Sequence, residues 1–312
     1  MSYQLLAFGS GEFGLPVFRA LATDLRFSFR GVVTQPPKPR QRGQQIQPTP
    51  VGRWAQEQDL ETISPASLRG SDVAQQISSF QADLFLVISY GLILPPKILQ
   101  LPLHGSVNVH ASLLPKYRGP APIPATILAG DTTTGVTLMV VDKGIDTGQI
   151  LGQYRLSVAP DDTSLTLADK LSSVAAQIVP DTVRDWLAGR RRSSPQPTTG
   201  ISYAPKINRD DGHATWDSAR GWQRKIRAFQ PWPGVWAMWR GQRVKLLAAD
   251  VIVRQPDVQP GTVAPLADGR SWAIACDDGW LQPRRLQFSG HRPQSADTIP
   301  GSYPGWLGSK LE

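Results

Sequence analysis

Short apolar runs alternate with helical segments through residues 1–189, and this alternation constrains the fold more than any other feature. The run at residues 4–8 ends in glycines, and residues 16–22 follow it with apolar residues at helical spacing. Further apolar runs, each predicting a strand, cover residues 29–34, 84–88, 106–110 and 136–141. Strands that alternate with helices predict a mostly parallel, Rossmann-like sheet with helices on both faces.

A longer helix is predicted at residues 165–187. Asp162 or Thr163 provides its N-terminal cap, Gly189 follows its end, and Pro180 is expected to kink it. Residues 190–199, RRRSSPQPTT, are polar, basic and proline-containing, a composition typical of a linker. We therefore expect the first domain to end near Gly189.

The chain beyond this linker has a different pattern. Short alternating segments are separated by Gly, Pro and Asp, which predicts a small antiparallel barrel. Eight of the ten tryptophans lie after residue 200, and we expect most of them in the core of that barrel rather than stacked on bases. The predicted organisation is a first domain at residues 1–189, a linker at residues 190–206 and a second domain at residues 207–312.

Composition limits the kinds of site this chain can build. Its 33 Lys and Arg exceed its 25 Asp and Glu, and this net charge of +8 suggests a substrate or partner that carries phosphates. The single cysteine, Cys276, excludes an internal disulfide and a multi-thiolate zinc site, so we expect no metal. Neither a signal peptide nor a membrane-spanning run is evident, so we predict a cytoplasmic protein that makes no use of a membrane. Nothing in the sequence demands a dimer, so we expect a monomer.

A dinucleotide motif stands at residues 9–14, where GSGEFG satisfies G-x-G-x-x-G between a strand and a helix. A dinucleotide fold also needs an acid at the end of the second strand to hold the ribose. This chain has VVTQP at residues 32–36 and no acid between Asp24 and Glu57. We therefore interpret the glycines as a tight turn and expect no bound NAD.

Three polar residues are predicted to meet at strand ends. Asn108 and His110 are two apart on one strand, so their side chains share a face, and Asp146 follows the strand at residues 136–141. An amide can donate to an oxyanion, an imidazole can exchange a proton and a carboxylate can act as a base. A serine hydrolase is disfavoured because no G-x-S-x-G elbow precedes a helix.

Two stretches carry a family resemblance. NVHASLLPKYRG at residues 108–119 and DKGIDTG at residues 142–148 resemble the signature of the formyltransferases that use 10-formyltetrahydrofolate. The signature is shared with glycinamide ribonucleotide and sugar-nucleotide formyltransferases, so it indicates the chemistry rather than the acceptor. The resemblance spans nearly the whole chain.

Other segments resemble the methionyl-tRNA branch of that family. They are TQP at residues 34–36 with the basic loop after it, PTPV at residues 48–51, YGLILP at residues 90–95 and RAFQPWP at residues 227–233. One departure is FGSGEF at residues 8–13, where family members usually read AGTPEF. Ser10 keeps a hydroxyl there, and Gly11 in place of proline creates the accidental dinucleotide motif.

The resemblance implies a set of site residues. Asn108, His110 and Asp146 are its catalytic trio, with 10-formyltetrahydrofolate as co-substrate, tetrahydrofolate as product and no metal. The residues it implies along the folate are Ser112, Leu113, Leu114, Pro115, Tyr90, Gly91, Leu92 and Ile93. The basic residues expected to contact tRNA are Lys38, Arg40, Arg42, Lys206 and Arg209.

The resemblance also implies an activity: formyl transfer to the α-amino group of methionyl initiator tRNA by a catalytic domain followed by an OB-like tRNA-binding domain. One alternative is a formyltransferase that acts on an amino sugar nucleotide, which the basic second domain disfavours. Another is a protein that binds nucleic acid or NAD without catalysis, which the intact trio disfavours.

Overall fold

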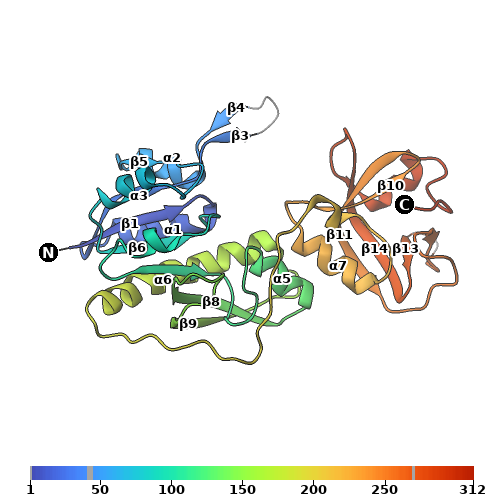
Figure 1. Cartoon of the computed structure of the whole chain (residues 1–312). Helices are drawn as coiled ribbons and strands as arrows, with labels where there is room; N and C mark the ends of the chain where they lie inside the picture. The colour runs from blue at the N-terminus through green and yellow to red at the C-terminus, as the bar shows by residue number, and fades with distance from the viewer. Residues whose placement is uncertain (1, 41–44, 269–270) are drawn as a thin grey trace. The chain divides into compact units, whose positions relative to one another are not determined.

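The structure is a computed structural model that describes residues 2–40, 45–268 and 271–312, and its chain divides into two units (Figure 1). Unit 1 comprises Met1–Pro122, Thr133–Val158 and Ala168–Pro205. Unit 2 comprises Ile123–Thr132, Ala159–Leu167 and Lys206–Glu312. The division of the chain at residues 189 and 206 into two functional domains and a linker remains a prediction.

The first half of unit 1 alternates strands and helices. Its elements are β1 (Tyr3–Gly9), the 3₁₀ turn η1 (Glu12–Gly14), α1 (Leu15–Ala22), β2 (Phe27–Val33), the hairpin β3 (Lys38–Arg40) and β4 (Gln45–Gln47), α2 (Pro50–Glu57), β5 (Thr62–Ile63), α3 (Ser71–Ser78), β6 (Leu84–Ile88), α4 (Pro96–Leu99) and β7 (Ser106–His110). After α5 (Pro122–Ala129) come β8 (Thr133–Val140), β9 (Ile150–Ser157) and α6 (Ser164–Leu187).

Seven strands form one sheet in the order β5-β2-β1-β6-β7-β8-β9. The first five are parallel, whereas β8 and β9 are antiparallel additions at one edge. Every residue of β6 is buried, as expected of a central strand covered on both faces. The predicted mostly parallel sheet is confirmed, and the predicted strands at residues 84–88 and 106–110 have the observed bounds.

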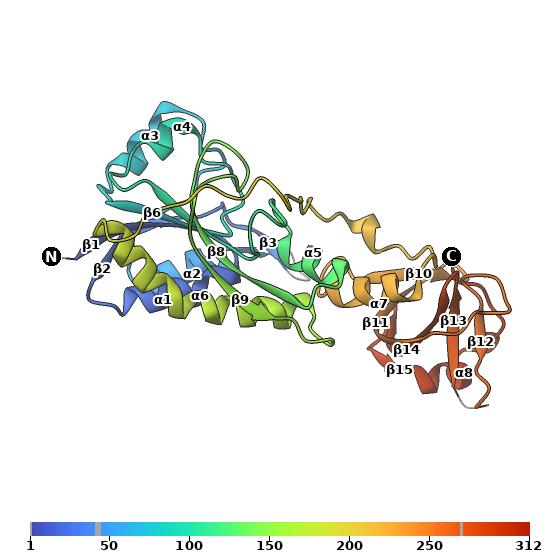
Figure 2. The ribbon, with the colours of Figure 1, turned by 90° about the horizontal axis from the view of Figure 1, so that it is seen from below.

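Helices cover both faces of this sheet (Figure 2). On one face, α1 and α2 pack an aromatic group in which the Phe18 ring stacks on Trp54 at 5.6 Å. On the other face, α3 and α4 cover a core in which the Phe8 ring lies 5.0 Å from Phe85. The side chains of β1 alternate between the two cores, which fixes its register.

The GSGEFG segment joins β1 to α1 through η1. A Cβ at Gly9 would lie 2.8 Å from the Phe18 ring, and one at Gly14 would lie 2.9 Å from the same ring. Real Cβ contacts are not this short, so these glycines are needed where the chain passes close to Phe18. Close packing therefore accounts for the two glycines.

Helix α6 matches the predicted long helix. The Thr163 hydroxyl accepts from the Thr166 amide at 3.3 Å, so Thr163 provides the cap. The helix continues through Pro180 to Leu187, and Gly189 follows with φ +68°. No helix in the described part of the chain is long and apolar enough to cross a membrane.

The segment after α6, predicted as a linker, follows unit 1 closely. Ser194 and Ile150 exchange backbone hydrogen bonds of 2.7 and 2.9 Å, and Arg191 donates to the Leu151 carbonyl. Ala204 donates its amide to the Arg118 carbonyl at 2.7 Å. Residues 190–205 are thus tied to the sheet domain rather than extended through solvent.

Unit 2 is an antiparallel barrel. Besides α5 and the first turn of α6, its elements are η2 (Arg209–Gly212), α7 (Ala219–Ala228), β10 (Val235–Trp239), β11 (Gln242–Ile252), β12 (Val263–Pro265), β13 (Trp272–Cys276), β14 (Gly279–Phe288), β15 (Gln294–Ser295), η3 (Ala296–Thr298) and α8 (Ile299–Ser302). The sheet order is β10-β11-β14-β13-β12, with β15 on β14. This confirms the predicted small OB-like domain.

The last residues of the chain close that barrel. Glu312 donates its amide to the Met238 carbonyl of β10 at 3.0 Å. Leu311 donates to Gly261, and Val263 of β12 donates to Ser309. Residues 309–312 therefore bridge the two edge strands and cover part of each edge.

The tryptophans of unit 2 are mostly core residues, as predicted. Trp306 is fully buried and packs edge-on against Trp239 and Trp272, with ring centroids 5.3 Å away in both cases. The other buried tryptophans of unit 2 are Trp216, Trp222, Trp236, Trp239, Trp272 and Trp280. Trp232 differs, because 55% of its surface is exposed.

The aromatic core predicts a large difference between two tryptophan substitutions. We expect Trp306→Ala to lower the free energy of unfolding of unit 2 by about 3–5 kcal/mol, because the substitution leaves a cavity. The exposed Trp232→Ala is the matched control and is expected to change it by about 0.5 kcal/mol or less. Urea unfolding of the full chain followed by circular dichroism measures both. Equal effects would contradict the assignment of Trp306 to the core.

Candidate active site

The three predicted catalytic residues come together in unit 1. Asn108 and His110 lie on β7 and share a face, whereas Asp146 lies in the loop between β8 and β9. Because β8 runs antiparallel to β7, its carboxyl end does not reach the edge where the parallel strands end. The loop after β8 must therefore turn back toward Asn108 and His110.

Short polar contacts build this loop. The Asp142 carboxylate accepts from the Gly144 amide at 2.9 Å and from the Thr147 hydroxyl at 2.7 Å. A Cβ at Gly144 would lie 2.0 Å from the Thr147 hydroxyl, and one at Gly148 would lie 1.7 Å from the Val140 carbonyl. The DKGIDTG loop thus has no room for a side chain at either glycine.

The Asp146 carboxylate is the meeting point of the site. Its Oδ1 accepts from Asn108 Nδ2 at 3.3 Å, and its Oδ2 accepts from the Gly119 amide at 2.8 Å. His110 Nδ1 lies 3.6 Å from Oδ2. Asp146 has φ +52°, in the left-handed region that is uncommon for residues other than glycine. Such a conformation persists where surrounding contacts hold it.

His110 is almost fully buried, and its two ring nitrogens have different surroundings. Nε2 lies 2.9 Å from the Tyr117 carbonyl, which only accepts, so Nε2 carries a hydrogen. Nδ1 is left to face Asp146. Burial lowers the pKa of His110, and the negative charge of Asp146 and the Tyr117 carbonyl oppose that shift. The neutral imidazole, with a free lone pair on Nδ1, is the favoured form.

The predicted folate segment at residues 112–115 lies beside the trio and is well fixed. The Ser112 hydroxyl donates to the Lys116 carbonyl at 2.6 Å, and the Leu114 amide donates to the Thr137 hydroxyl at 3.1 Å. Leu114 and Pro115 are buried, and Leu113 is half-buried. The Ser112 hydroxyl is engaged within its own loop, and the part of these residues in folate binding stays a prediction.

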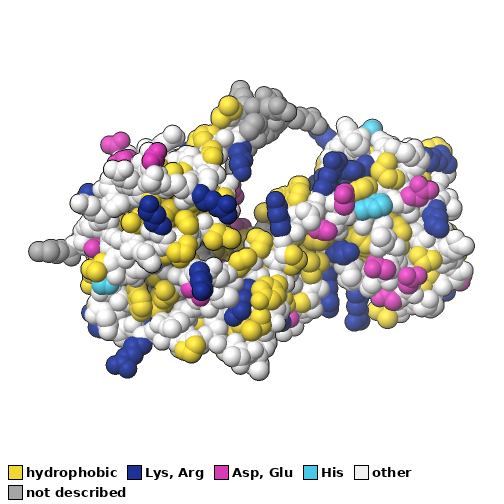
Figure 3. Space-filling view, in the orientation of Figure 1, with side chains coloured by type: hydrophobic (Ala, Val, Ile, Leu, Met, Phe, Trp, Pro, Cys, Tyr) yellow, Lys and Arg dark blue, Asp and Glu magenta, His cyan; other side chains and the backbone are white. Residues whose placement is uncertain are grey.

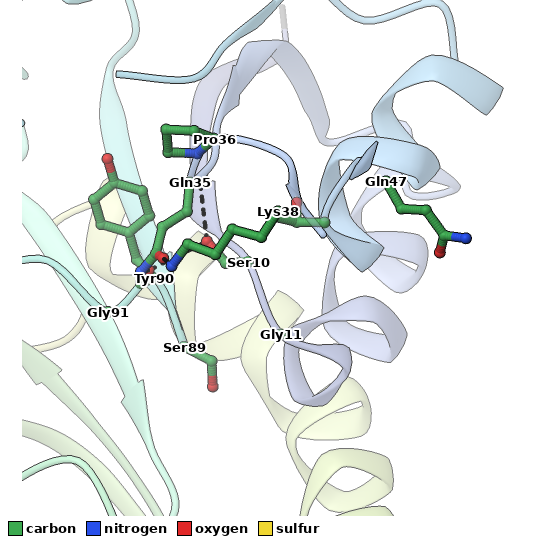
Figure 4. A pocket seen from close by; sticks show the side chains of 10 residues that line it. Ser10, Gly11, Gln35, Pro36, Lys38, Gln47, Ser89, Tyr90 and Gly91 are labelled. Carbon is green, nitrogen blue, oxygen red and sulfur yellow. Dashed lines mark hydrogen bonds between the residues drawn. The ribbon is translucent and has the colours of Figure 1, made fainter. Parts of the chain in front are cut away.

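A pocket of about 230 Å³ opens at the carboxyl ends of β1, β2 and β6 (Figure 4). Ser10 is at its base, where its hydroxyl accepts from the Gln35 amide and donates to the Tyr90 carbonyl. The Gln35 side chain donates to the same carbonyl at 2.9 Å and accepts from Lys38 Nζ at 2.8 Å. The full lining is Ser10, Gly11, Gln35, Pro36, Lys38, Gln47, Thr49, Ser89, Tyr90 and Gly91.

The pocket brings together residues that the sequence assigned to two ligands. Tyr90 and Gly91 were predicted to line the folate site, and Lys38 was predicted to contact tRNA. The Tyr90 ring packs edge-on against Phe8, and its buried hydroxyl has no partner among the described residues. Burial raises the pKa of Tyr90 to about 12. Leu92 is half-buried, and Ile93 is exposed.

The other residues that were predicted to contact tRNA lie in different parts of the chain. Arg40 belongs to strand β3, and Arg42 lies outside the described residues. Lys206 and Arg209 are exposed on unit 2. In the described ranges neither of these two forms an ion pair with an acid.

Two residues that touch the site were missed by sequence reasoning. The Gln196 side chain donates to the Asp146 and Gly148 carbonyls, and Arg118 donates to Gln196. Gln196 lies in the segment of linker composition, which gave no signal of such contacts. In the described part of the chain, no group of three or more His, Cys, Asp or Glu could hold a metal ion.

Comparisons with known proteins agree with the signature motifs. Residues 3–183 match the profile of formyl transferase, and residues 206–303 match that of the formyl transferase C-terminal domain. The first match covers more than half of the chain.

Similar solved structures share the fold. WlaRD, a sugar 3N-formyl transferase solved with dTDP and 5-N-formyl-THF, is 16% identical over 94% of this chain and 99% of its own, with a TM-score of 0.66. The N-formyltransferase of Helicobacter canadensis, solved with folinic acid and dTDP-3-aminofucose, is 17% identical over 91% and 99%, with a TM-score of 0.63. Phosphoribosylglycinamide formyltransferase of Bacillus halodurans is 26% identical over 59% and 95%, with a TM-score of 0.50.

The lowered pKa of His110 predicts a pH dependence of stability. The unfolded chain binds a proton near the ordinary value of 6.5, whereas folded His110 binds it only at lower pH. The stability from this group is therefore present above pH 6.5 and lost as the pH falls from there toward the lowered value. We expect His110→Gln to reduce the difference in unfolding free energy between about pH 7.5 and about pH 5.5.

Urea titrations at the two pH values measure this difference. The matched control is His291→Gln at an exposed histidine, which leaves His110 in place and should retain the wild-type dependence. An unchanged dependence in His110→Gln would show that His110 is not held neutral in the folded protein.

Proposed function

The chain belongs to the formyl transferase family, and from that premise we propose that it transfers the formyl group of 10-formyltetrahydrofolate to the α-amino group of methionyl initiator tRNA. The products are tetrahydrofolate and N-formylmethionyl-tRNA. The observation that carries the chemistry is the contact of Asp146 with both Asn108 and His110. Reduced folates bound to the similar sugar formyltransferases support the choice of co-substrate.

Asn108 is suited to stabilise the oxyanion. Attack of an amine on the formyl carbon gives a tetrahedral intermediate with a negative oxygen and a positive nitrogen. One Asn108 amide hydrogen points to Asp146, and the second has no partner among the described residues. That second hydrogen is available to the oxyanion, where such donors matter most.

Asp146 and His110 are suited to move the proton. Asp146 accepts the proton of the attacking nitrogen, directly or through a water. Because neutral His110 has a lone pair on Nδ1 facing Asp146 Oδ2, the proton can be held between these two atoms. It can then pass to the departing N10 of the folate. The bond between the formyl carbon and N10 breaks, and the new bond between the formyl carbon and the amine nitrogen remains.

The acceptor assignment is supported by the sequence segments of the methionyl-tRNA branch and by exposed positive charge on unit 2. Figure 3 shows Lys and Arg side chains gathered around α7 on the face in view. Some of this charge has internal uses: Arg224 donates to the Ala129 carbonyl and Arg227 to the Asp162 carbonyl. Burial and the charge of Arg224 lower the pKa of Arg227. Exposed basic residues of unit 2 near α7 that are available to phosphates include Lys206, Arg209 and Arg220.

A second acceptor class is favoured by the fold comparison. Both WlaRD and the Helicobacter canadensis enzyme are similar to this chain over more than 90% of its length, and both were solved with dTDP or a dTDP-linked sugar. An amino sugar nucleotide also carries a primary amine and a pyrophosphate. We therefore include this acceptor as the alternative in the test of function.

Substitutions in the trio test the chemistry. We expect Asp146→Asn to lower kcat for formyl transfer by about 10²–10⁴-fold, because it removes the base. Asn108→Ala should lower kcat by about 10²–10³-fold, because it removes an oxyanion donor. Asp169→Asn, at an exposed acid on α6, is the matched control. Near-normal turnover of either trio variant, with an unchanged circular dichroism spectrum, would remove that residue from the mechanism.

Acceptor competition tests the substrate. Transfer of a labelled formyl group is measured to methionyl initiator tRNA, methionyl elongator tRNA and a dTDP-linked 3-amino sugar. We expect the initiator tRNA to be used best, with a KM that rises steeply with salt because phosphate contacts release counterions. Charge reversal at Lys206 and Arg209 should raise that KM about 10-fold and leave kcat unchanged. Preferred use of the sugar would establish the alternative, and equal use of both tRNAs would remove initiator selectivity.

A further inference from the structure

Three loops of unit 1 form a closed network around Asp146. The loop at residues 112–119 supplies the Gly119 amide to Asp146, and the Tyr117 carbonyl of the same loop accepts from His110. The segment at residues 194–204 fixes that loop, because Ser202 accepts from the Tyr117 amide through its hydroxyl and from the Arg118 amide through its carbonyl, at 2.9 Å each. Gln196 joins this segment to the loop that carries Asp146.

The Gln196 side chain can take only one orientation in this network. Arg118 donates from Nε and from a terminal nitrogen to Gln196 Oε1, at 3.2 and 2.7 Å. A guanidinium has no acceptor, so the amide oxygen must face Arg118. The Gln196 Nε2 group then faces the carbonyls of Asp146 and Gly148 and donates to them at 2.8 and 2.9 Å.

Gln196 contacts the backbone of Asp146, which has an uncommon conformation. Asp146 has φ +52°, and its carbonyl accepts from Gln196. Gly148, two residues on, passes close against the Val140 carbonyl. Gln196 thus bridges the two carbonyls that flank Thr147 and fixes the direction in which the Asp146 side chain leaves the loop.

We propose that Gln196, oriented by the buried guanidinium of Arg118, is a positioning residue that holds the Asp146 carboxylate against Asn108 and His110. It contacts Asp146 only through the backbone, so it is not itself catalytic. The effect on turnover rests on the proposed function. The effect on the loop does not, because it follows from the hydrogen bonds alone.

Two variants distinguish the hydrogen bonds that Gln196 donates to the two carbonyls from those that it accepts from Arg118. Gln196→Met has similar length but neither donates nor accepts. Gln196→Glu keeps an acceptor for Arg118 but has no hydrogen to give the two carbonyls. We expect both variants to lower kcat about 100-fold, the size of effect of a misplaced catalytic group, with the KM of either substrate changed less than about twofold. Gln75→Met, at an exposed glutamine on α3, is the control.

Hydrogen exchange of the full-length protein gives a readout that needs no acceptor. In both Gln196 variants we expect faster exchange of the Gly119 amide, whose acceptor is the Asp146 carboxylate. Peptides that cover residues 116–121 and 143–149 report it by mass spectrometry. Equal melting temperatures of Gln196→Glu and the parent exclude general unfolding as the cause.

The outcomes are distinct. Normal kcat and normal Gly119 exchange in Gln196→Glu would overturn the proposal and reduce Gln196 to a partner of Arg118. A raised KM with unchanged kcat would also overturn it, because Gln196 would then serve binding. If the parent enzyme transfers no formyl group to methionyl-tRNA, the proposed function fails, and the exchange rates still decide whether Gln196 holds Asp146.

Discussion

The placement of one carboxylate, Asp146, organises unit 1 around its reactive centre. Asn108 and the Gly119 amide donate to it, and His110 faces it from β7. Asn108 and His110 come from β7 and Gly119 from the loop after it, whereas Asp146 comes from a loop that must reverse direction after an antiparallel strand. A parallel sheet alone would not bring them together. The tight loop that the glycines of DKGIDTG allow and the contacts of the segment at residues 190–205 hold these groups together.

The parts of the fold that were predictable are those with a strong local pattern. The strands at residues 84–88 and 106–110 are short apolar runs between turn signals, and burial on both faces produces that pattern directly. The helix at residues 164–187 has both a cap and a terminating glycine. By contrast, β9 is an edge strand in which half-buried and exposed residues mostly alternate, and no apolar run marks it. The direction of β8 depends on its partner strand, so the local sequence pattern of β8 does not predict it.

The candidate site shows the same division. Asn108 and His110 are adjacent on a strand and were predicted to share a face, and Asp146 was predicted to join them. Gln196 and Arg118 act through hydrogen bonds between segments about 80 positions apart in the chain, and neither residue type marks such a contact. Charge was similarly misleading. Arg224 and Arg227 look in sequence like nucleic-acid contacts, but their guanidinium groups bind backbone carbonyls within unit 2.

The closure of the barrel by residues 309–312 has a consequence for synthesis. The strands of the sheet in unit 1 are all made by residue 157, so that sheet can form while the rest of the chain is still being translated. In unit 2, Met238 of β10 and Val263 of β12 lack their backbone partners until residues 309–312 have been translated. Each of these two strands therefore gains its final backbone hydrogen bonds only at that point. The barrel of unit 2 is therefore completed only after all strands of the unit 1 sheet have been made.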